Sequence, residues 1–183
     1  MFQAVCYRLL KFIGWDFVGQ LPKKPQYIII VAPHTSNWDF IIGLLACYAL
    51  GEKIHFLGKH QLFIPPWGWL FRAVGGTPVD RSKSNNLVEG ASLLFKHNPH
   101  FKLALTPEGT RSTVTRWKIG FYHIARQANV PIVTVGFDFK LKKIIIGDDM
   151  IPSQDIEKDM QKIIHFHRNI NGRHPKDIPD FKN

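Results

Sequence analysis

Short apolar runs alternate along the chain with longer segments in which apolar residues recur at helical spacing. Continuous apolar runs predict strands that are covered on both faces, and helical spacing predicts helices with one buried face. The predicted strands are residues 27–32, 54–58, 77–79, 101–105, 130–137 and 143–147, and the predicted helices are residues 38–50, 85–97, 118–127 and 154–170, with a short helix inside 65–76. This alternation predicts a single three-layer α/β domain with a mostly parallel sheet flanked by helices.

An amphipathic N-terminal helix precedes the first predicted strand and is expected to end near Gly14. Its apolar stripe consists of Phe2, Val5, Leu9, Phe12 and Ile13. An aromatic stripe of this kind suits a membrane interface, but a helix packed on its own domain has the same pattern, so both interpretations stay open. We therefore divide the chain into the amphipathic helix (1–20), the main domain (21–170) and a polar tail of low order (171–183).

Polar residues follow several of the predicted strands at the point where each strand ends. His34 follows the strand 27–32, Arg81 follows the extended piece 77–79, and Glu108 and Arg111 follow the strand 101–105. Ligands bind α/β sheets in the crevice beyond the carboxyl ends of the strands. The sequence therefore predicts that these side chains share one site.

The segment HTSNWD places His34 five residues before Asp39. A neutral imidazole can take a proton from a hydroxyl group when a carboxylate holds its other nitrogen, so the pair is a candidate general-base dyad. The spacing alone is weak evidence, because a histidine bonded to the backbone of its loop has the same pattern. Thr35 and Ser36 are candidate nucleophiles, although their position suits capping of the following helix better, with Ser36 or Asn37 as the cap.

The segment TPEGTR, at 106–111, forms a polar turn directly after a predicted strand. Gly109 permits a positive φ and close backbone approach, and the guanidinium group of Arg111 can bind a phosphate through two hydrogen bonds. The alternative is an ordinary turn in which Glu108 pairs with Arg111. The chain lacks the phosphate-binding patterns of nucleoside triphosphate and dinucleotide sites, so the turn predicts a different anionic ligand.

Charge and composition narrow the class of protein. The 183 residues are 45% hydrophobic and carry a net charge of +10, which predicts a folded domain with anionic partners. Arg81 can bind a phosphate or pair with a carboxylate such as Asp80. Six further basic residues are expected to form a solvated face that also attracts anionic lipid. This face would comprise Arg72, Arg116, Lys118, Lys140, Lys142 and Lys143.

Other sequence features limit the compartment and the cofactors. Cys6 and Cys47 are too few for a disulfide scaffold, and the N-terminus is a poor signal peptide, so a reducing compartment is expected. The longest apolar run, 40–50, would span about 16 Å as a helix, which is too short to cross a membrane. The one close histidine pair, His165 and His167, lies on a helix with a surface pattern, so no metal and no resident cofactor are expected.

Four motifs in this order resemble the blocks of the glycerolipid acyltransferase family, whose best-known members are the lysophosphatidate (1-acylglycerol-3-phosphate) acyltransferases. The matching residues are His34 and Asp39 in the first block, Arg81 in the second, Glu108, Gly109, Thr110 and Arg111 in the third with Lys118 and Gly120 after them, and 130–133 in the fourth. The blocks cover more than half of the chain. Thr106 stands where the family usually has an aromatic residue, Pro78 stiffens the approach to Arg81, and the transmembrane helix of some members is absent.

The resemblance implies transfer of a fatty acyl group from coenzyme A or acyl carrier protein to the hydroxyl of a lyso-glycerophospholipid, with 1-acylglycerol-3-phosphate as the expected acceptor. His34 would be the base and Asp39 its orienting partner, while Arg81 and Arg111 would hold the phosphate, and Glu108, Gly109, Thr110 and Lys118 would complete the substrate-binding set. Such an enzyme is expected in the cytoplasm, peripherally on the inner face of the membrane.

Three alternative functions remain at this point. The same dyad can acylate another lyso-lipid, such as a lyso-ornithine lipid, whose headgroup needs less phosphate binding. A basic nucleic-acid-binding domain would fit the charge, but the sequence contains no RNA- or DNA-binding motif. A non-catalytic lipid-binding module would not need both His34 and Asp39.

Overall fold

The computed structural model describes residues 2–79 and 84–181. Within these residues, one seven-stranded sheet has the order β1-β7-β6-β2-β5-β3-β4. The strands are β1 (Asp16–Val18), β2 (Tyr27–Val31), β3 (His55–Lys59), β4 (Gly76–Val79), β5 (Lys102–Leu105), β6 (Ile132–Asp138) and β7 (Lys143–Met150). All neighbouring strands are parallel except β6 and β7. The predicted α/β class with a mostly parallel sheet is confirmed.

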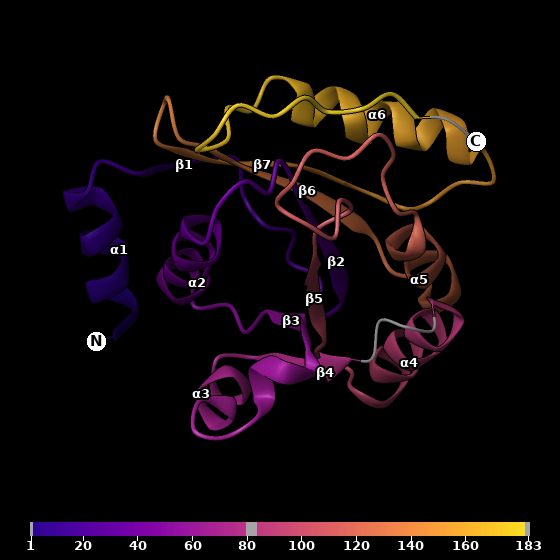
Figure 1. Ribbon diagram of the computed structural model, residues 1–183, viewed down its shortest axis with the longest axis horizontal. Coiled ribbons are helices and arrows are strands. Elements are labelled where there is room, and N and C mark those ends of the chain that lie inside the picture. Colours follow the sequence, from indigo (N-terminus) through magenta and orange to yellow (C-terminus); the bar gives the residue numbers. More distant parts are fainter. Residues whose placement is uncertain (1, 80–83, 182–183) are drawn as a thin grey trace.

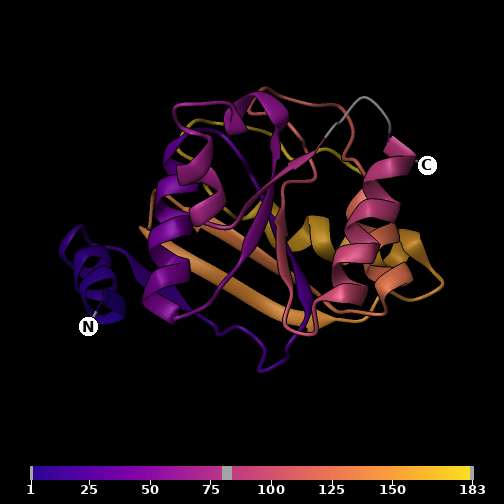
Figure 2. The same cartoon turned by 90° about the horizontal axis from the view of Figure 1, so that it is seen from below.

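Helices cover both faces of the sheet (Figure 1). They are α1 (Phe2–Phe12), α2 (Trp38–Leu50), the short 3₁₀-helix η1 (His60–Phe63), α3 (Gly68–Ala73), α4 (Ser84–His97), α5 (Gly120–Ala128) and α6 (Ile156–Arg168). Figure 2 shows α1 and α2 on one side of the sheet and α4, α5 and α6 on the other. The helix predicted at 38–50 is found with the same bounds. Gly51 ends it in the left-handed conformation, with a φ of 70° that glycine adopts readily.

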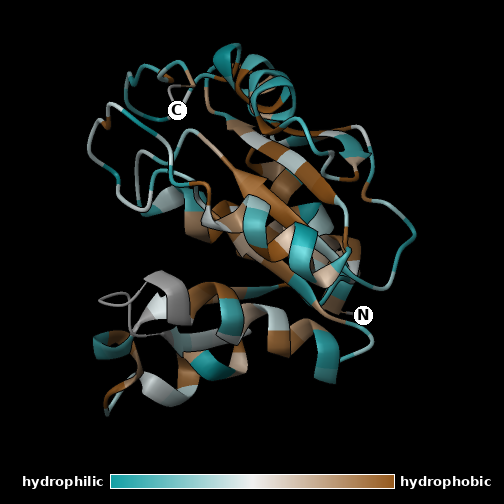
Figure 3. Ribbon diagram, turned by 90° about the vertical axis from the view of Figure 1, so that its right-hand side faces the viewer, coloured by the Kyte–Doolittle hydropathy of each residue, from teal (hydrophilic) through white to brown (hydrophobic). Residues whose placement is uncertain are grey.

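Strand β2 lies at the centre of the sheet and is buried on both faces, as its continuous apolar sequence predicts. Ile28 and Ile30 pack with residues of α4, α5 and α6, whereas Tyr27 and Ile29 pack with residues of α1 and α2. Figure 3 shows the hydropathy of the ribbon, with hydrophobic central strands and a largely hydrophilic α6 at the top of the view. This buried strand fixes the position of the loop that follows it.

Strand β1 was not expected from the sequence. It has only three residues and begins with the exposed Asp16, so no periodic pattern marks it. Its parallel pairing with β7, in which Asp16 lies opposite Lys143, gives it its extended conformation. Tertiary pairing rather than local sequence forms this edge of the sheet.

Most of the predicted apolar stripe of α1 is exposed, so the stripe is not the main face by which the helix packs on the domain. Cys6 and Leu10 are buried against α2. Ile13 packs against the same cluster and the ring of Phe2 contacts Tyr48, but most of the stripe surface faces solvent. The exposed residues are Phe2, Val5, Leu9 and Phe12, and Phe12 is 89% exposed. In the described part of the chain, no helix combines the length and apolar character needed to cross a bilayer.

The segment after α6 was expected to be a tail of low order, but through residue 181 it packs against the domain. The amide group and backbone N–H of Asn171 donate to Asp138, and the backbone carbonyl of Asn171 accepts from the N–H of Phe139. Ile178 and Phe181 then pack against the core on the α4–α6 face. Alternating polar anchors and single apolar residues hold the segment, which is why no periodic pattern predicted its order.

Candidate active site

The loops after β2 and β5 meet because these two strands are parallel neighbours, with Ile30 opposite Leu105. The backbone N–H of His34 donates to Oε2 of Glu108 at 2.8 Å. The structure therefore brings together the first and third sequence motifs, at the carboxyl ends of the strands as predicted. Arg81, the candidate of the second motif, lies outside the described residues.

His34 and Asp39 form the dyad geometry that the sequence suggested. Nδ1 of His34 lies 2.8 Å from Oδ2 of Asp39, whose residue is only 3% exposed. A carboxylate accepts only, so Nδ1 carries the hydrogen and the neutral ring keeps Nε2 as its proton acceptor. The His34 side chain remains 23% exposed, which leaves it accessible to a substrate.

Asp39 also organises the turn that leads into α2. Besides the imidazole, its Oδ2 accepts the backbone N–H groups of Thr35 at 2.7 Å and Ser36 at 2.9 Å. Its other oxygen, Oδ1, is buried and has no hydrogen-bond partner among the described residues. One carboxylate at the positive end of a helix thus fixes both the loop backbone and the histidine ring.

The hydroxyl groups in this turn have structural partners. Oγ of Ser36 accepts the N–H of Trp38 at 3.0 Å, and Oγ1 of Thr35 accepts the N–H of His174 at 3.4 Å. Both residues are buried. These contacts favour the capping interpretation over a nucleophilic one. Asn37 occupies the cap position without a side-chain cap bond and instead accepts from Arg111.

Glu108 pairs with Lys176 and not with Arg111, which corrects the alternative considered from the sequence. The residue is 2% exposed, and its Oε2 lies 3.0 Å from Nζ of Lys176. Burial raises the pKa of Glu108, and the hydrogen bonds from His34 and Lys176 act in the opposite direction. Sequence reasoning missed Lys176 because it lies between two prolines in a segment without periodicity.

The turn after β5 presents cations to solvent. Gly109 has a φ of +66°, as its place in the turn predicted, and a Cβ there would lie 3.2 Å from Nζ of Lys118. Arg111 and Lys118 are exposed, and Arg111 donates to the side chain of Asn37 across to the α2 loop. The hydroxyl of Thr110 accepts the N–H of Ser112 at 3.3 Å. Two exposed cations therefore lie at this turn, and one of them, Arg111, contacts the loop that carries the dyad.

His167 corrects the interpretation of the His165 and His167 pair as a surface pair. His167 is fully buried, and burial lowers its pKa to about 4. Its Nδ1 lies 2.7 Å from the carbonyl oxygen of Ile163, and its Nε2 lies 3.3 Å from that of Ile30. His167 is thus a neutral core residue beneath β2. Across the described residues, no group of three or more His, Cys, Asp or Glu side chains is placed to hold a metal ion.

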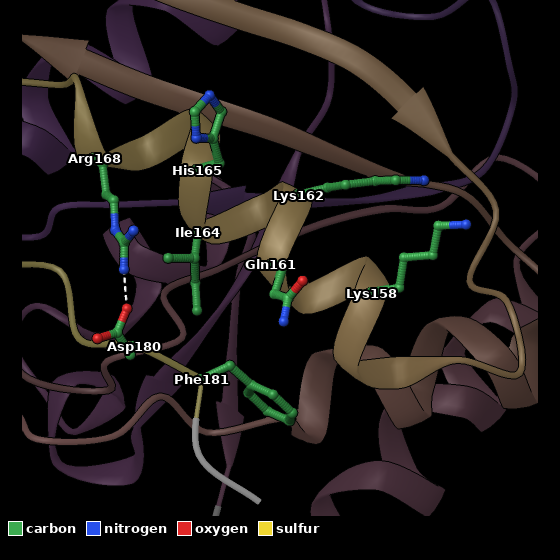
Figure 4. A pocket seen from close by; sticks show the side chains of 8 residues that line it. All are labelled: Lys158, Gln161, Lys162, Ile164, His165, Arg168, Asp180 and Phe181. Atoms are coloured by element: carbon green, nitrogen blue, oxygen red, sulfur yellow. Dashed lines mark hydrogen bonds and ion pairs between the residues drawn. The ribbon is translucent and has the colours of Figure 1, made fainter.

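A separate pocket lies between the outer face of α6 and the C-terminal segment (Figure 4). Its lining is largely basic and polar, and Arg168 donates to Asp180 across it. The lining residues are Lys158, Gln161, Lys162, Ile164, His165, Arg168, Asp180 and Phe181. None of the predicted site residues is among them, so the dyad remains the candidate active site.

The Acyltransferase family matches residues 17–138, which contain the dyad, Arg81, the TPEGTR turn and Lys118. The match covers well over half of the chain. A parallel sheet with a His–Asp pair beyond β2 and a cationic turn beyond β5 is the arrangement that the sequence motifs led us to expect. The chain belongs to the Acyltransferase family.

Individual relatives agree with this assignment. The chain is 34% identical to the 1-acyl-sn-glycerol-3-phosphate acyltransferase of Saccharomyces cerevisiae over 70% of its own length and 45% of the yeast protein. It is 34% identical to the epsilon form from Mus musculus over 55% of this chain and 29% of that protein, and 26% identical to the Streptococcus pneumoniae enzyme over 75% and 54%. The chain thus spans about half, or less, of the curated relatives that it matches.

A solved structure shows the same fold. The 1-acyl-sn-glycerophosphate (LPA) acyltransferase PlsC from Thermotoga maritima superposes with a TM-score of 0.63 at 18% sequence identity. The likeness covers 91% of this chain and 75% of the Thermotoga chain.

Proposed function

We propose that this protein transfers a fatty acyl group from acyl-coenzyme A or acyl carrier protein to the hydroxyl of 1-acylglycerol-3-phosphate. The observation that carries the proposal is the hydrogen bond between Nδ1 of His34 and the buried carboxylate of Asp39, next to the cationic turn after β5. The names of the relatives support the acceptor. Membership of the Acyltransferase family supports the reaction type.

The dyad would act as a general base. Nε2 of His34 takes the proton of the acceptor hydroxyl as its oxygen attacks the thioester carbonyl, and Asp39 stabilises the imidazolium ion that forms. The carbon–sulfur bond then breaks, and the imidazolium ion returns the proton to the leaving thiolate. The acceptor oxygen takes the place of a catalytic serine, so no covalent enzyme intermediate is needed.

The assay that tests this function offers purified protein both acyl donors with a panel of lyso-lipid acceptors and follows thiol release. We expect release that depends on 1-acylglycerol-3-phosphate. A preference for lyso-ornithine lipid would support the alternative acceptor. No release with any donor and acceptor, together with binding of lipid or nucleic acid, would contradict the enzymatic assignment.

We assign the acceptor phosphate to the exposed cations of the turn. Arg111 can form two hydrogen bonds with a phosphate, Lys118 lies over Gly109 beside it, and Arg81 is expected to join them. Glu108 cannot contact phosphate favourably, because it is a buried acceptor already engaged by His34 and Lys176. Its role is therefore to position the loop rather than to bind the acceptor.

Arg111→Ala should raise KM for 1-acylglycerol-3-phosphate by about 10-fold or more, since a charge-assisted hydrogen bond contributes about 1.5–3 kcal/mol. KM for an acceptor without a phosphate should change far less. Steady-state kinetics with both acceptors measures the difference, and Arg116→Ala, an exposed arginine in the following loop, is the matched control. Equal losses on the two acceptors would refute the phosphate assignment.

We also propose that the protein binds peripherally to the membrane, on the cytoplasmic face where its soluble donors are expected. The exposed residues of α1 form one apolar surface, and a second follows β3 around α3. The second surface comprises Leu62, Ile64, Trp67, Trp69 and Leu70. Exposed tryptophan and large aliphatic side chains suit the membrane interface, and the net charge of +10 favours anionic lipid.

The structure permits a sharper test than deleting the N-terminal helix, because Cys6 and Leu10 are core residues. Replacing Val5, Leu9 and Phe12 with serine removes exposed apolar groups and leaves Phe2, whose ring contacts Tyr48 of α2, in place. Even about 1 kcal/mol of lost insertion per side chain would weaken vesicle binding by about 100-fold or more. Sedimentation with anionic vesicles measures this change, with Leu141→Ser and Ile151→Ser as exposed controls elsewhere. Unchanged sedimentation would exclude α1 from the membrane contact.

A further inference from the structure

The C-terminal segment runs along the active-site loops, and several of its residues contact them. Gly172 approaches the HTSNWD loop so closely that a Cβ would lie 2.7 Å from Cγ2 of Thr35. The guanidinium group of Arg173 lies 5.1 Å from the ring centroid of Trp38, and the N–H of His174 donates to Thr35. Asn171 anchors the segment before these residues, and Ile178 and Phe181 anchor it after them. This anchoring places Lys176 at the site.

The ammonium group of Lys176 can donate three hydrogen bonds, and three oxygen acceptors lie around it. Nζ lies 3.0 Å from Oε2 of Glu108, 3.0 Å from the carbonyl oxygen of His34 and 3.3 Å from the carbonyl oxygen of Thr110. The side chains of Lys176 and Glu108 are 2% and 0% exposed. A buried ammonium group is stable only when its hydrogen bonds are satisfied. Here the acceptors come from both the loop after β2 and the turn after β5.

These contacts complete the fixation of His34. Its backbone N–H donates to Glu108, its carbonyl oxygen accepts from Lys176, and its Nδ1 donates to Asp39. Nε2 is the one hydrogen-bonding position of the residue without a recorded partner in the described chain. Two of the three fixed contacts depend on the pair of Glu108 and Lys176, which also joins the histidine loop to the backbone of Thr110.

We propose that Lys176 is a positioning residue for the catalytic base, and this inference rests on the proposed acyl transfer. Lys176 neutralises Glu108 and thereby keeps it as an acceptor for the N–H of His34. At the same time it holds the carbonyl groups of His34 and Thr110 at a fixed separation. The C-terminal segment, which no motif marks, is thus part of the active-site scaffold.

Lys176→Met keeps the length of the side chain and removes its charge. We expect kcat to fall at least 10-fold, with KM for the acyl donor within about 3-fold of the wild-type value, at a temperature well below melting. Lys176→Arg should recover part of the loss, because it retains the charge. Lys158→Met, an exposed lysine on α6, should retain wild-type kcat. A lower melting temperature with unchanged kcat in Lys176→Met would show a structural role only and overturn the proposal.

A second variant covers the case in which an unpaired Glu108 prevents folding. The double variant Glu108→Gln and Lys176→Met contains no buried charge at this place, so it is expected to fold while kcat stays at least 10-fold below that of the wild type. Recovery of the full wild-type kcat in the double variant would overturn the positioning role.

A spectroscopic measurement separates this inference from the proposed function. In the wild type, the backbone amide resonance of His34 reports its hydrogen bond to Glu108. Lys176→Met should move that resonance and raise the pKa of Glu108, because the hydrogen bond and charge of Lys176 lower it, whereas Lys158→Met should do neither. These shifts would support the positioning role even in a protein that transferred no acyl group, and their absence would contradict it even in an active enzyme.

Discussion

His34→Ala should lower kcat for acyl transfer by about 10²–10⁴-fold, while the melting temperature stays close to that of the wild type. General-base catalysis contributes about 10²–10⁴-fold in rate, and no other described group occupies the position of Nε2. The fold should survive because the side chain lies in a loop and is partly exposed. Asp39 still accepts the N–H groups of Thr35 and Ser36 in the variant, so the turn retains its backbone contacts.

His100→Ala is the matched control for this change. His100 is an exposed loop histidine just before β5, at the end of that strand opposite the site, so its removal should leave kcat within about 2-fold. Rates and thermal melting of both variants separate a chemical role from a structural one. If His34→Ala retained a rate within about 10-fold of the wild type, the general-base role would be refuted.

The sequence predicted the parts of the site that follow from strand order. His34 and Glu108 each follow a buried apolar run, and parallel strands bring such loops to one edge of a sheet. The helix from Trp38 to Leu50 was predicted with its correct bounds because an apolar segment lies between a turn and Gly51. In each of these cases, a local signal and the global fold agree.

Features that depend on long-range packing were not predictable in this way. Lys176 reaches Glu108 across 68 positions of sequence, and that contact depends on anchoring of the C-terminal segment by Asn171 on one side and by Ile178 and Phe181 on the other. His167 lies on a helix whose surface pattern suggested exposure, but it belongs to the buried face of that helix and contacts the carbonyl oxygen of Ile30 in β2. The side on which α1 packs was equally hidden, because Cys6 and Leu10, which lie off the predicted stripe, are the residues that it buries.

Asp39→Asn should lower kcat by about 10²–10⁴-fold while KM for the acceptor changes little, as loss of an orienting carboxylate does in other histidine-based sites. The amide oxygen can take the place of Oδ2 and accept the N–H groups of Thr35 and Ser36, so the turn can keep its geometry. Its oxygen can also accept the hydrogen on Nδ1 of His34, but the neutral amide cannot stabilise an imidazolium ion as the carboxylate does.

Asp159→Asn is a closely matched control for Asp39→Asn. Asp159 is also a buried carboxylate in the first turn of a helix, and its Oδ2 accepts from the N–H of Ser153 and the hydroxyl of Tyr122. Its replacement should cost stability of the same order while leaving kcat unchanged, because its partners lie on the α5–α6 side of the domain, away from the dyad. Parallel measurement of melting temperature and kcat in the two variants therefore separates the loss of a buried acceptor from the loss of a catalytic partner. If both variants lost activity only in proportion to their loss of stability, Asp39 would be a capping residue of α2, and His34 would act without an orienting partner.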